Sequence, residues 1–257
     1  MRVRVLLPAY NEAKALPHLL LRLAAVHLVL RNLEVVVVDD GSRDDTAKVV
    51  REFAATHAWV RLIDHDRNRG LGAAMRTGIA FALEELNDGD ALVALDADNT
   101  HDPTLLLDML DRLTAGYDVI IASRFAAGGR EVGLAPHRQL LSRGASWLMR
   151  CTCPVPGVKD YSCGYRAYKV GALRRMSRSF PDLVSSVNFD CMAQILLQLA
   201  TVGARCTEVG MVLRYDLKGG ASKMKVWRTV KGYFRLMRHF SPGLLGNNVL
   251  GPMLQGW

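Results

Sequence analysis

Two aspartates, Asp96 and Asp98, directly follow the short apolar run at residues 91–95. In extended backbone the side chains of residues i and i+2 point the same way, so both carboxylates would face one point. Two like charges this close repel each other unless a divalent cation, an arginine or water lies between them. Carboxylate oxygens suit Mg²⁺ or Mn²⁺, which take one or two protein carboxylates and complete their shells with water and substrate phosphates.

Short apolar runs alternate with longer stretches of helical periodicity through the first half of the chain. The expected strands are residues 3–7, 34–38, 60–64, 91–95 and 119–122, and the expected helices are residues 13–30, 45–56, 71–86 and 104–115. This alternation predicts an α/β fold with a mostly parallel central sheet flanked by helices.

Polar, acidic and glycine residues follow each of these five strands, at the sheet edge where α/β proteins bind ligands. They are residues 8–12, 39–42, 66–70, 96–98 and 123–124. One such cluster is ordinary turn and capping chemistry. Five clusters at one edge predict a site.

The second half of the chain is less regular. We expect helices at residues 137–150 and 188–202, a strand at 160–169 and extended chain at 205–215. Residues 226–240 mix apolar and basic side chains at helical spacing, which fits an interfacial helix on anionic lipid, a core helix or a dimer face. We therefore divide the chain into a main domain, residues 1–225, and a C-terminal amphipathic helix with its tail, residues 226–257.

Composition narrows the functional classes. The 257 residues carry a formal net charge of +8, which suits polyanionic ligands such as nucleotide diphosphates or lipid phosphates. No helix-turn-helix or RNA-binding signature is present, so no nucleic acid is expected. The GLG at residues 70–72 lacks the third glycine of a dinucleotide fingerprint, and the chain has no GxxxxGK[ST] phosphate loop.

The cellular setting is also predicted. Five cysteines, an odd number without CxxC spacing, indicate reduced thiols in the cytoplasm. His57, His65 and His101 show no zinc-ligand spacing and are expected at the surface or in packing. No run of about 18 apolar residues suggests a spanning helix, so contact with a membrane would be peripheral.

Five segments, in this order and spacing, resemble the family 2 glycosyltransferases of GT-A fold. They are PAYNEA at 8–13, VVDDGSRDDT at 37–46, RNRGLGAAMRTG at 67–78, DADNTHDP at 96–103 and SRF at 123–125. Within that family the chain is similar to the dolichyl- and polyprenyl-phosphate mannosyltransferases, through DADNTHDP, DYSCGYRAY at 160–168 and RYDLKGGASKMK at 214–225.

The resemblance implies roles for individual residues. The implied nucleotide-sugar-binding residues are Pro8, Tyr10, Asn11, Glu12, Asp39, Asp40, Asp96, Ala97, Asp98, Arg124, Arg138, Arg214 and Lys223. Among them, Asp96 and Asp98 would hold Mg²⁺ or Mn²⁺, and together with Arg124, Arg214 and Lys223 they form the implied catalytic set. Thr100 stands where the family often has glutamine, which leaves the third metal ligand open.

The class of acceptor can be inferred from whether the sequence contains a general base for the transfer of the sugar. No ED pair suited to deprotonating a sugar hydroxyl stands out, although Asp160 or Asp190 stays open as a base. A phosphate acceptor is already anionic at neutral pH and needs little help from a base. We therefore expect an inverting, metal-dependent transfer of a hexose to polyprenyl or dolichyl phosphate at the cytoplasmic membrane face. By resemblance the sugar is mannose and GDP-mannose is a candidate donor, but the sequence leaves the donor base open between guanosine and uridine.

Two other functions fit the same motifs. The chain could glycosylate a soluble small molecule, or it could bind nucleotide sugars without turnover. The sequence leaves the oligomeric state open.

Overall fold

The computed structural model describes residues 1–134, 136–217 and 226–241, except for the side chains of residues 136–138, 141, 226 and 227. A seven-stranded sheet forms its centre, in the order β3-β2-β1-β4-β7-β5-β8. The strands are β1 (Val3–Ala9), β2 (Leu33–Asp39), β3 (Val60–Asp64), β4 (Ala91–Ala94), β5 (Val119–Ser123), β7 (Arg166–Lys169) and β8 (Cys206–Gly210). All neighbours pair in parallel except β7, which is antiparallel to β4 and β5. The predicted mostly parallel sheet is confirmed.

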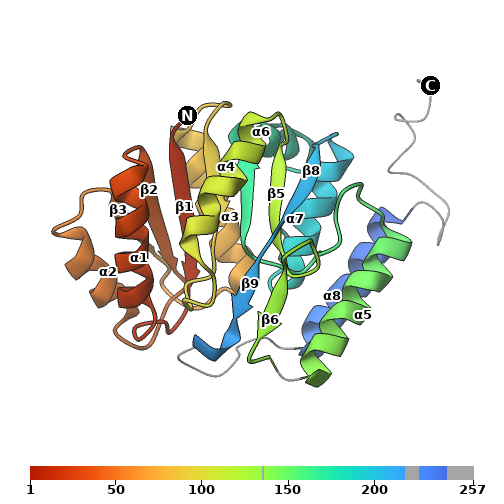
Figure 1. The fold of residues 1–257 in the computed structure, drawn as a ribbon, viewed down its shortest axis with the longest axis horizontal. Helices are drawn as coiled ribbons and strands as arrows, with labels where there is room; N and C mark the ends of the chain where they lie inside the picture. The colour runs from red at the N-terminus through yellow and green to blue at the C-terminus, as the bar shows by residue number, and fades with distance from the viewer. Residues whose placement is uncertain (135, 218–225, 242–257) are drawn as a thin grey trace.

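Helices cover both faces of the sheet (Figure 1). The helices α1 (Leu16–Val29), α2 (Thr46–Ala54) and α4 (Leu106–Thr114) form one group, since α1 contacts α2 and both α1 and α4 contact the short 3₁₀ turn η1 (Pro103–Leu105). On the other face, α3 (Leu71–Glu85), α6 (Val170–Ser179) and α7 (Asp190–Thr201) contact one another. Because both faces are covered, the strands read as continuous apolar runs, such as the buried valines at positions 35–38 of β2.

Two parts of the second half differ from the sequence prediction. The expected strand at 160–169 is wrong in its first six residues, since β7 begins only at Arg166. A helix, α6, follows β7 at a place where the sequence analysis expected none. Because β7 runs antiparallel, the segment before it lies at the carboxyl ends of β4 and β5; Arg166 pairs with Ala94, the last residue of β4. Residues 160–165 are thereby delivered to the ligand-binding edge.

The extended stretch at 205–215 is confirmed, as β8 and then β9 (Val212–Arg214). β9 pairs in parallel with β6 (Arg130–Val132) in a separate two-stranded sheet. A second 3₁₀ turn, η2 (Tyr215–Leu217), follows β9.

The last described helix, α8 (Val226–Phe240), lies beside α5 (Pro136–Thr152) at one end of the molecule (Figure 1). Helix α8 also packs on α7, and its Tyr233, Leu236 and Met237 join the buried apolar core. The domain boundary at residue 225 stays a prediction. All five cysteines are free thiols, and four of them are buried. Among the described helices, none is long and apolar enough to span a bilayer.

Candidate active site

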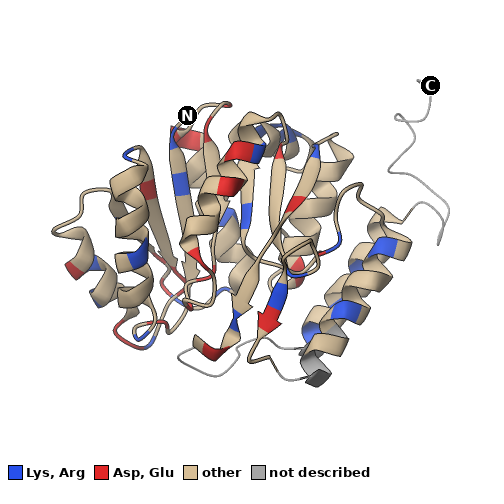
Figure 2. Cartoon of the chain, in the orientation of Figure 1, with Lys and Arg blue, Asp and Glu red and all other residues tan. Residues whose placement is uncertain are grey.

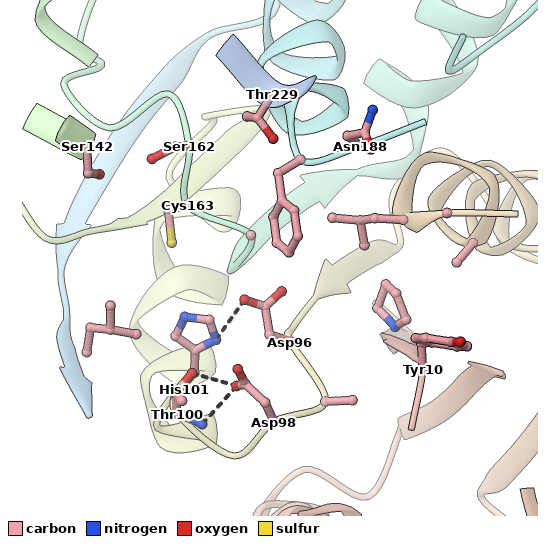
Figure 3. A pocket seen from close by; sticks show the side chains of 18 of the residues that line it. Tyr10, Asp96, Asp98, Thr100, His101, Ser142, Ser162, Cys163, Asn188 and Thr229 are labelled. Atoms are coloured by element: carbon pink, nitrogen blue, oxygen red, sulfur yellow. Dashed lines mark hydrogen bonds and ion pairs between the residues drawn. The ribbon is translucent and has the colours of Figure 1, made fainter. Parts of the chain in front are cut away.

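A cavity of about 770 Å³ lies at the carboxyl edge of the sheet. Its lining comes from loops after β1, β2, β3, β4 and β5, from the segment before β7, and from α5 and α8. Among the residues that line it are Pro8, Tyr10, Glu12, Asp40, Asn68, Gly70, Asp96, Ala97, Asp98, Thr100, His101, Arg124, Ser142, Ala145, Ser162, Cys163, Gly164, Asn188, Phe189, Tyr215, Thr229, Val230 and Tyr233. Figure 3 shows Asp96 and Asp98 between Tyr10 on one side and Ser162 with Cys163 on the other. The edge predicted from the sequence therefore carries the cavity.

Asp40 holds one wall of the cavity in place. Its buried carboxylate accepts hydrogen bonds from the backbone N–H groups of Arg69 (2.9 Å) and Gly70 (2.7 Å). Its Oδ1 also lies 2.8 Å from Nδ1 of His65, whose Nε2 is 3.0 Å from the hydroxyl of Thr77. Asp40 thus fixes the loop after β3 against the end of β2, and His65 is a buried packing residue as expected.

Asp39 and Asn11 lie behind the cavity wall and are absent from its described lining. Asp39 accepts hydrogen bonds from the backbone N–H and the hydroxyl of Ser42, and burial raises the pKa of its carboxyl. Asn11, at φ 53°, accepts from the backbone N–H of Arg43 (2.8 Å). Both side chains shape the loop after β2. Of the nucleoside-binding residues implied by resemblance, Pro8, Tyr10, Glu12, Asp40 and Ala97 line the cavity.

Asp96 and Asp98 both line the cavity, in the loop that follows β4 (Figure 3). The hydroxyl of Thr100 donates to Oδ1 of Asp98 at 2.6 Å, and the backbone N–H of Thr100 lies 3.2 Å from the same oxygen. Nδ1 of His101 lies 3.9 Å from Oδ2 of Asp96. That nitrogen is buried and has no hydrogen-bond partner in the described structure.

These residues fit a hard divalent cation. Gly164 packs its backbone directly against Asp96: a Cβ at that position would lie only 2.6 Å from Oδ1 of Asp96, so a side chain there would displace the carboxylate. The two carboxylates offer the oxygen donors that Mg²⁺ and Mn²⁺ prefer, and the buried Nδ1 of His101 beside them has no hydrogen-bond partner in the described structure. Within the described residues, no three acidic, histidine or cysteine side chains form a complete metal cluster. A cation held here would therefore complete its shell with water and substrate oxygens.

Arg124 lines the cavity but is held by two carboxylates. Its Nε and Nη2 donate to Asp160 at 2.7 and 2.8 Å, and its Nη1 lies 3.1 Å from Glu131. Burial acts to lower the pKa of Arg124, but the charge of Asp160 raises it above its ordinary value. Burial likewise acts to raise the pKa of Asp160, and the charge of Arg124 holds it below its ordinary value. Asp160 is therefore an ionised structural partner and a poor candidate for a general base.

Of the other basic residues implied by resemblance, the structure describes only the side chain of Arg214, which is absent from the described lining of the cavity. Arg214 forms an exposed pair with Asp216, with Nη2 at 2.7 Å from Oδ2, although its neighbour Tyr215 lines the cavity. Arg138 belongs to α5, but its side chain lies outside the described residues, as does the whole of Lys223. Their phosphate-binding roles stay predictions.

Several lining residues were missed by sequence reasoning. They are His101, Ser162, Cys163, Asn188, Phe189, Thr229 and Tyr233. The DYSCGYRAY segment was noticed only as a family feature; its Ser162 accepts a hydrogen bond from Arg124 at 2.7 Å. The spacing of His101 from Asp96 and Asp98 was a usable signal. Residues 188 and 189 carry no motif and reach the cavity through packing.

The glycines at 70 and 72 explain how residues 186–189 arrive there. The backbone N–H of Gly72 donates to the carbonyl of Val187 at 3.1 Å, so the two segments touch backbone to backbone. A Cβ at Gly72 would overlap the carbonyl oxygen of Ser186, and Gly70 has φ 91°. The GLG sequence thus serves a close crossing of chain segments, in line with the failed dinucleotide fingerprint.

Comparisons with known proteins bear on this cavity. The model of the glycosyl transferase family 2 matches residues 4–176. An undecaprenyl-phosphate mannosyltransferase of Micrococcus luteus is 31% identical over 224 residues, which is 87% of this chain and 88% of that protein. A polyprenol monophosphomannose synthase of Mycolicibacterium smegmatis is 35% identical over 182 residues, or 70% of this chain and 66% of that one.

A solved structure supports the same fold. A mannosyltransferase of Pyrobaculum calidifontis, in complex with GDP-Man and Mn²⁺, superposes with a TM-score of 0.61 at 21% identity. The match covers 96% of this chain and 66% of that chain. The structural neighbours are GT-A glycosyltransferases, so the GT-A fold expected from the motifs is confirmed.

Proposed function

The chain belongs to glycosyltransferase family 2, and on that premise we propose that it moves a hexose, with mannose the expected sugar, from a nucleotide-diphosphate sugar to a polyprenyl phosphate. The observation that carries the proposal is the cavity that Asp96 and Asp98 line together with Tyr10 and Glu12, which follow β1, and with residues of α5 and α8. Two relatives that cover most of this chain are named as polyprenyl-phosphate mannosyltransferases.

The donor would bind across the ends of β1, β2 and β4. Tyr10 and Glu12 offer a ring and a carboxylate to the nucleoside, and the loop fixed by Asp40 closes the wall beside them. Asp96 and Asp98 would hold Mg²⁺ or Mn²⁺, with His101 as a nearby donor. Such a cation neutralises the developing charge of the leaving diphosphate. The relative solved with GDP-Man and Mn²⁺ supports this donor class.

The acceptor phosphate would attack the anomeric carbon as an anion, opposite the departing diphosphate. The bond between that carbon and the diphosphate oxygen breaks, its electron pair leaves with the nucleotide, and the configuration inverts. No proton has to be removed from a phosphate dianion, so a general base is dispensable. Of the two base candidates from the sequence, Asp160 is committed to Arg124 and Asp190 is absent from the described lining of the cavity, which supports a phosphate acceptor over a sugar hydroxyl.

The phosphates would meet basic side chains from the second half of the sequence. Arg214 and Lys223 are proposed to stabilise the leaving diphosphate, and Arg138 the donor or acceptor phosphate. Around the reacting centre, Phe189 and Tyr233 present aromatic surface to the cavity. Such surface would exclude water, which competes with the acceptor for the activated sugar.

A labelling experiment tests the proposal. Purified protein with Mn²⁺ or Mg²⁺ is given a panel of labelled nucleotide sugars, with and without polyprenyl phosphate, and label entering the organic phase is counted. We expect transfer from one donor only when the lipid is present. Donor hydrolysis without lipid labelling would favour a soluble acceptor, and donor binding with no turnover would favour a silent nucleotide-sugar-binding protein.

A further inference from the structure

The two helices at one end of the molecule carry almost all of the net charge of the chain. Helix α5 contains Arg138, Arg143 and Arg150, helix α8 contains Arg228, Lys231, Arg235 and Arg238, and neither contains an aspartate or a glutamate. The other 26 basic residues of the chain are matched by all 25 acidic ones. The net positive charge therefore comes from these two helices, and Figure 2 shows basic segments on them without acidic ones.

The exposed residues of each helix lie on a single face. On α5 they are Leu140, Arg143, Gly144, Trp147, Arg150 and Cys151, and on α8 they are Arg228, Lys231, Phe234, Arg235, Arg238 and His239. Steps of three and four residues place such positions along one side of a helix. We call these twelve residues the α5–α8 surface.

Large apolar side chains stand out from this basic surface. Leu140 is 74% exposed, Trp147 59% and Phe234 55%. Among the described residues, no ion pair involves the basic side chains of the α5–α8 surface, so no carboxylate in that part of the chain neutralises their charge. Basic side chains without partners in the described structure can bind anionic headgroups, and the aromatic and aliphatic side chains among them can insert into the apolar layer beneath. This combination is complementary to an anionic lipid bilayer.

The opposite faces of the same helices line the reaction cavity. Ser142 and Ala145 of α5, and Thr229, Val230 and Tyr233 of α8, are part of its wall. A partner held on the α5–α8 surface would therefore lie one helix thickness from the wall of the cavity. This placement suits a partner that brings the acceptor with it.

We propose that the α5–α8 surface docks on an anionic lipid bilayer, with Trp147, Phe234 and Leu140 inserted among the headgroups and the basic residues on the lipid phosphates. The inference rests on the proposed function for its purpose, because a polyprenyl phosphate is reached only at a membrane surface. Docking would set the cavity beside the plane in which that phosphate lies. Nucleic acid and a second copy of the chain are the competing partners, and the test separates them.

The test is sedimentation of the full chain with vesicles of phosphatidylcholine alone or with added phosphatidylglycerol. We expect binding to the anionic vesicles and its loss at high salt. The double variant Arg143→Gln/Arg235→Gln should bind on the order of 25-fold more weakly, at about fivefold for each charge removed. Trp147→Ser and Phe234→Ser should each weaken binding on the order of tenfold.

Two matched variants provide controls. Leu28→Ser removes a 65% exposed leucine from α1, and Arg112→Gln removes an exposed arginine from α4, both outside the α5–α8 surface. Neither should alter vesicle binding. All variants of the surface should keep the transfer of sugar to a short, water-soluble prenyl phosphate, because none of the altered residues lines the described cavity.

Each other outcome overturns the inference or separates it from the proposed function. Absent binding to anionic vesicles, or binding that survives all the surface substitutions, overturns it. So does binding to duplex nucleic acid in place of vesicles, or a dimer in ultracentrifugation that Trp147→Ser and Phe234→Ser dissolve without any vesicle effect. Vesicle binding that depends on the surface, with no transfer to any prenyl phosphate, supports docking and contradicts the proposed function.

Discussion

Replacing Asp160 by alanine would leave the guanidinium of Arg124 buried with Glu131 as its remaining acidic partner. Asp160 is fully buried, and the Arg124 side chain is 9% exposed. The variant removes the hydrogen bonds from Nε (2.7 Å) and Nη2 (2.8 Å) and the acceptor of the Cys163 backbone N–H (3.1 Å). Removing one partner of a buried ion pair typically costs about 3–5 kcal/mol. We expect the free energy of unfolding to fall by about that amount.

The chain contains its own control for this experiment. Arg214 and Asp216 form the same kind of pair, with an N–O distance of 2.7 Å, but on the surface. Exposed pairs contribute little because water and salt screen them. Asp216→Ala should therefore leave the urea midpoint nearly unchanged, as measured by circular dichroism, while Asp160→Ala lowers it strongly. Equal effects of the two substitutions would refute the burial argument.

The pH dependence of the same pair has a definite sign. Because the pKa of Asp160 is lowered on folding, its stabilisation is present above the pKa of an unfolded aspartate, about 3.9, and is lost as pH falls through the folded value. The stability difference between the wild type and Asp160→Asn should stay constant from about pH 5 to 8 and narrow below about pH 4. A difference that instead changes near neutral pH would contradict this assignment.

Three further predictions follow from the site. Asp98→Ala should abolish turnover and weaken Mn²⁺ binding in calorimetry while the circular dichroism spectrum is kept; undiminished activity of the wild type in metal-stripped buffer would contradict the metal role. Gly72→Ala should destabilise the fold by about 1–3 kcal/mol, because its methyl group meets the carbonyl of Ser186, whereas Gly144→Ala, in open space on α5, should add up to about 1 kcal/mol. Asp39→Asn keeps an acceptor oxygen and, because burial raises the carboxyl pKa, should match or exceed the wild type in stability at pH 7, with an advantage that disappears as pH falls to about 4; a variant clearly less stable at pH 7 would contradict it.

The sequence predicted those parts of the fold that local pattern determines. The four valines of β2 and the short run of β4 are apolar throughout because both faces of the sheet are covered. The position of β7 between β4 and β5 depends on contacts between segments far apart in the sequence. The residue pattern at 160–169 therefore does not predict that the strand runs antiparallel or that it begins at Arg166. For the same reason, the arrival of residues 160–165 at the cavity could not be predicted from the pattern of strands and helices.

In the candidate site, too, local motifs predicted some residues, whereas contacts between distant segments could not be predicted. Asp96 and Asp98 were predictable because a motif stands at the end of a strand where the topology requires a site. Asp39 and Asp40 are neighbours at the end of β2 and point to different sides, so only Asp40 lines the cavity. The alternation of side chains along a strand allowed that distinction in principle. The ion pair between Arg124 and Asp160 could not be predicted from the sequence, because the two residues are 36 positions apart.

The central claim is tested most directly by isolating the lipid product of one turnover. Wild type and Asp98→Asn are each given labelled GDP-mannose, Mn²⁺ and polyprenyl phosphate, and the anomeric configuration of any sugar in the organic phase is read by NMR. The account predicts a polyprenyl phosphohexose of inverted configuration from the wild type and almost none from the variant. A product of retained configuration, or equal product from the two proteins, would contradict it.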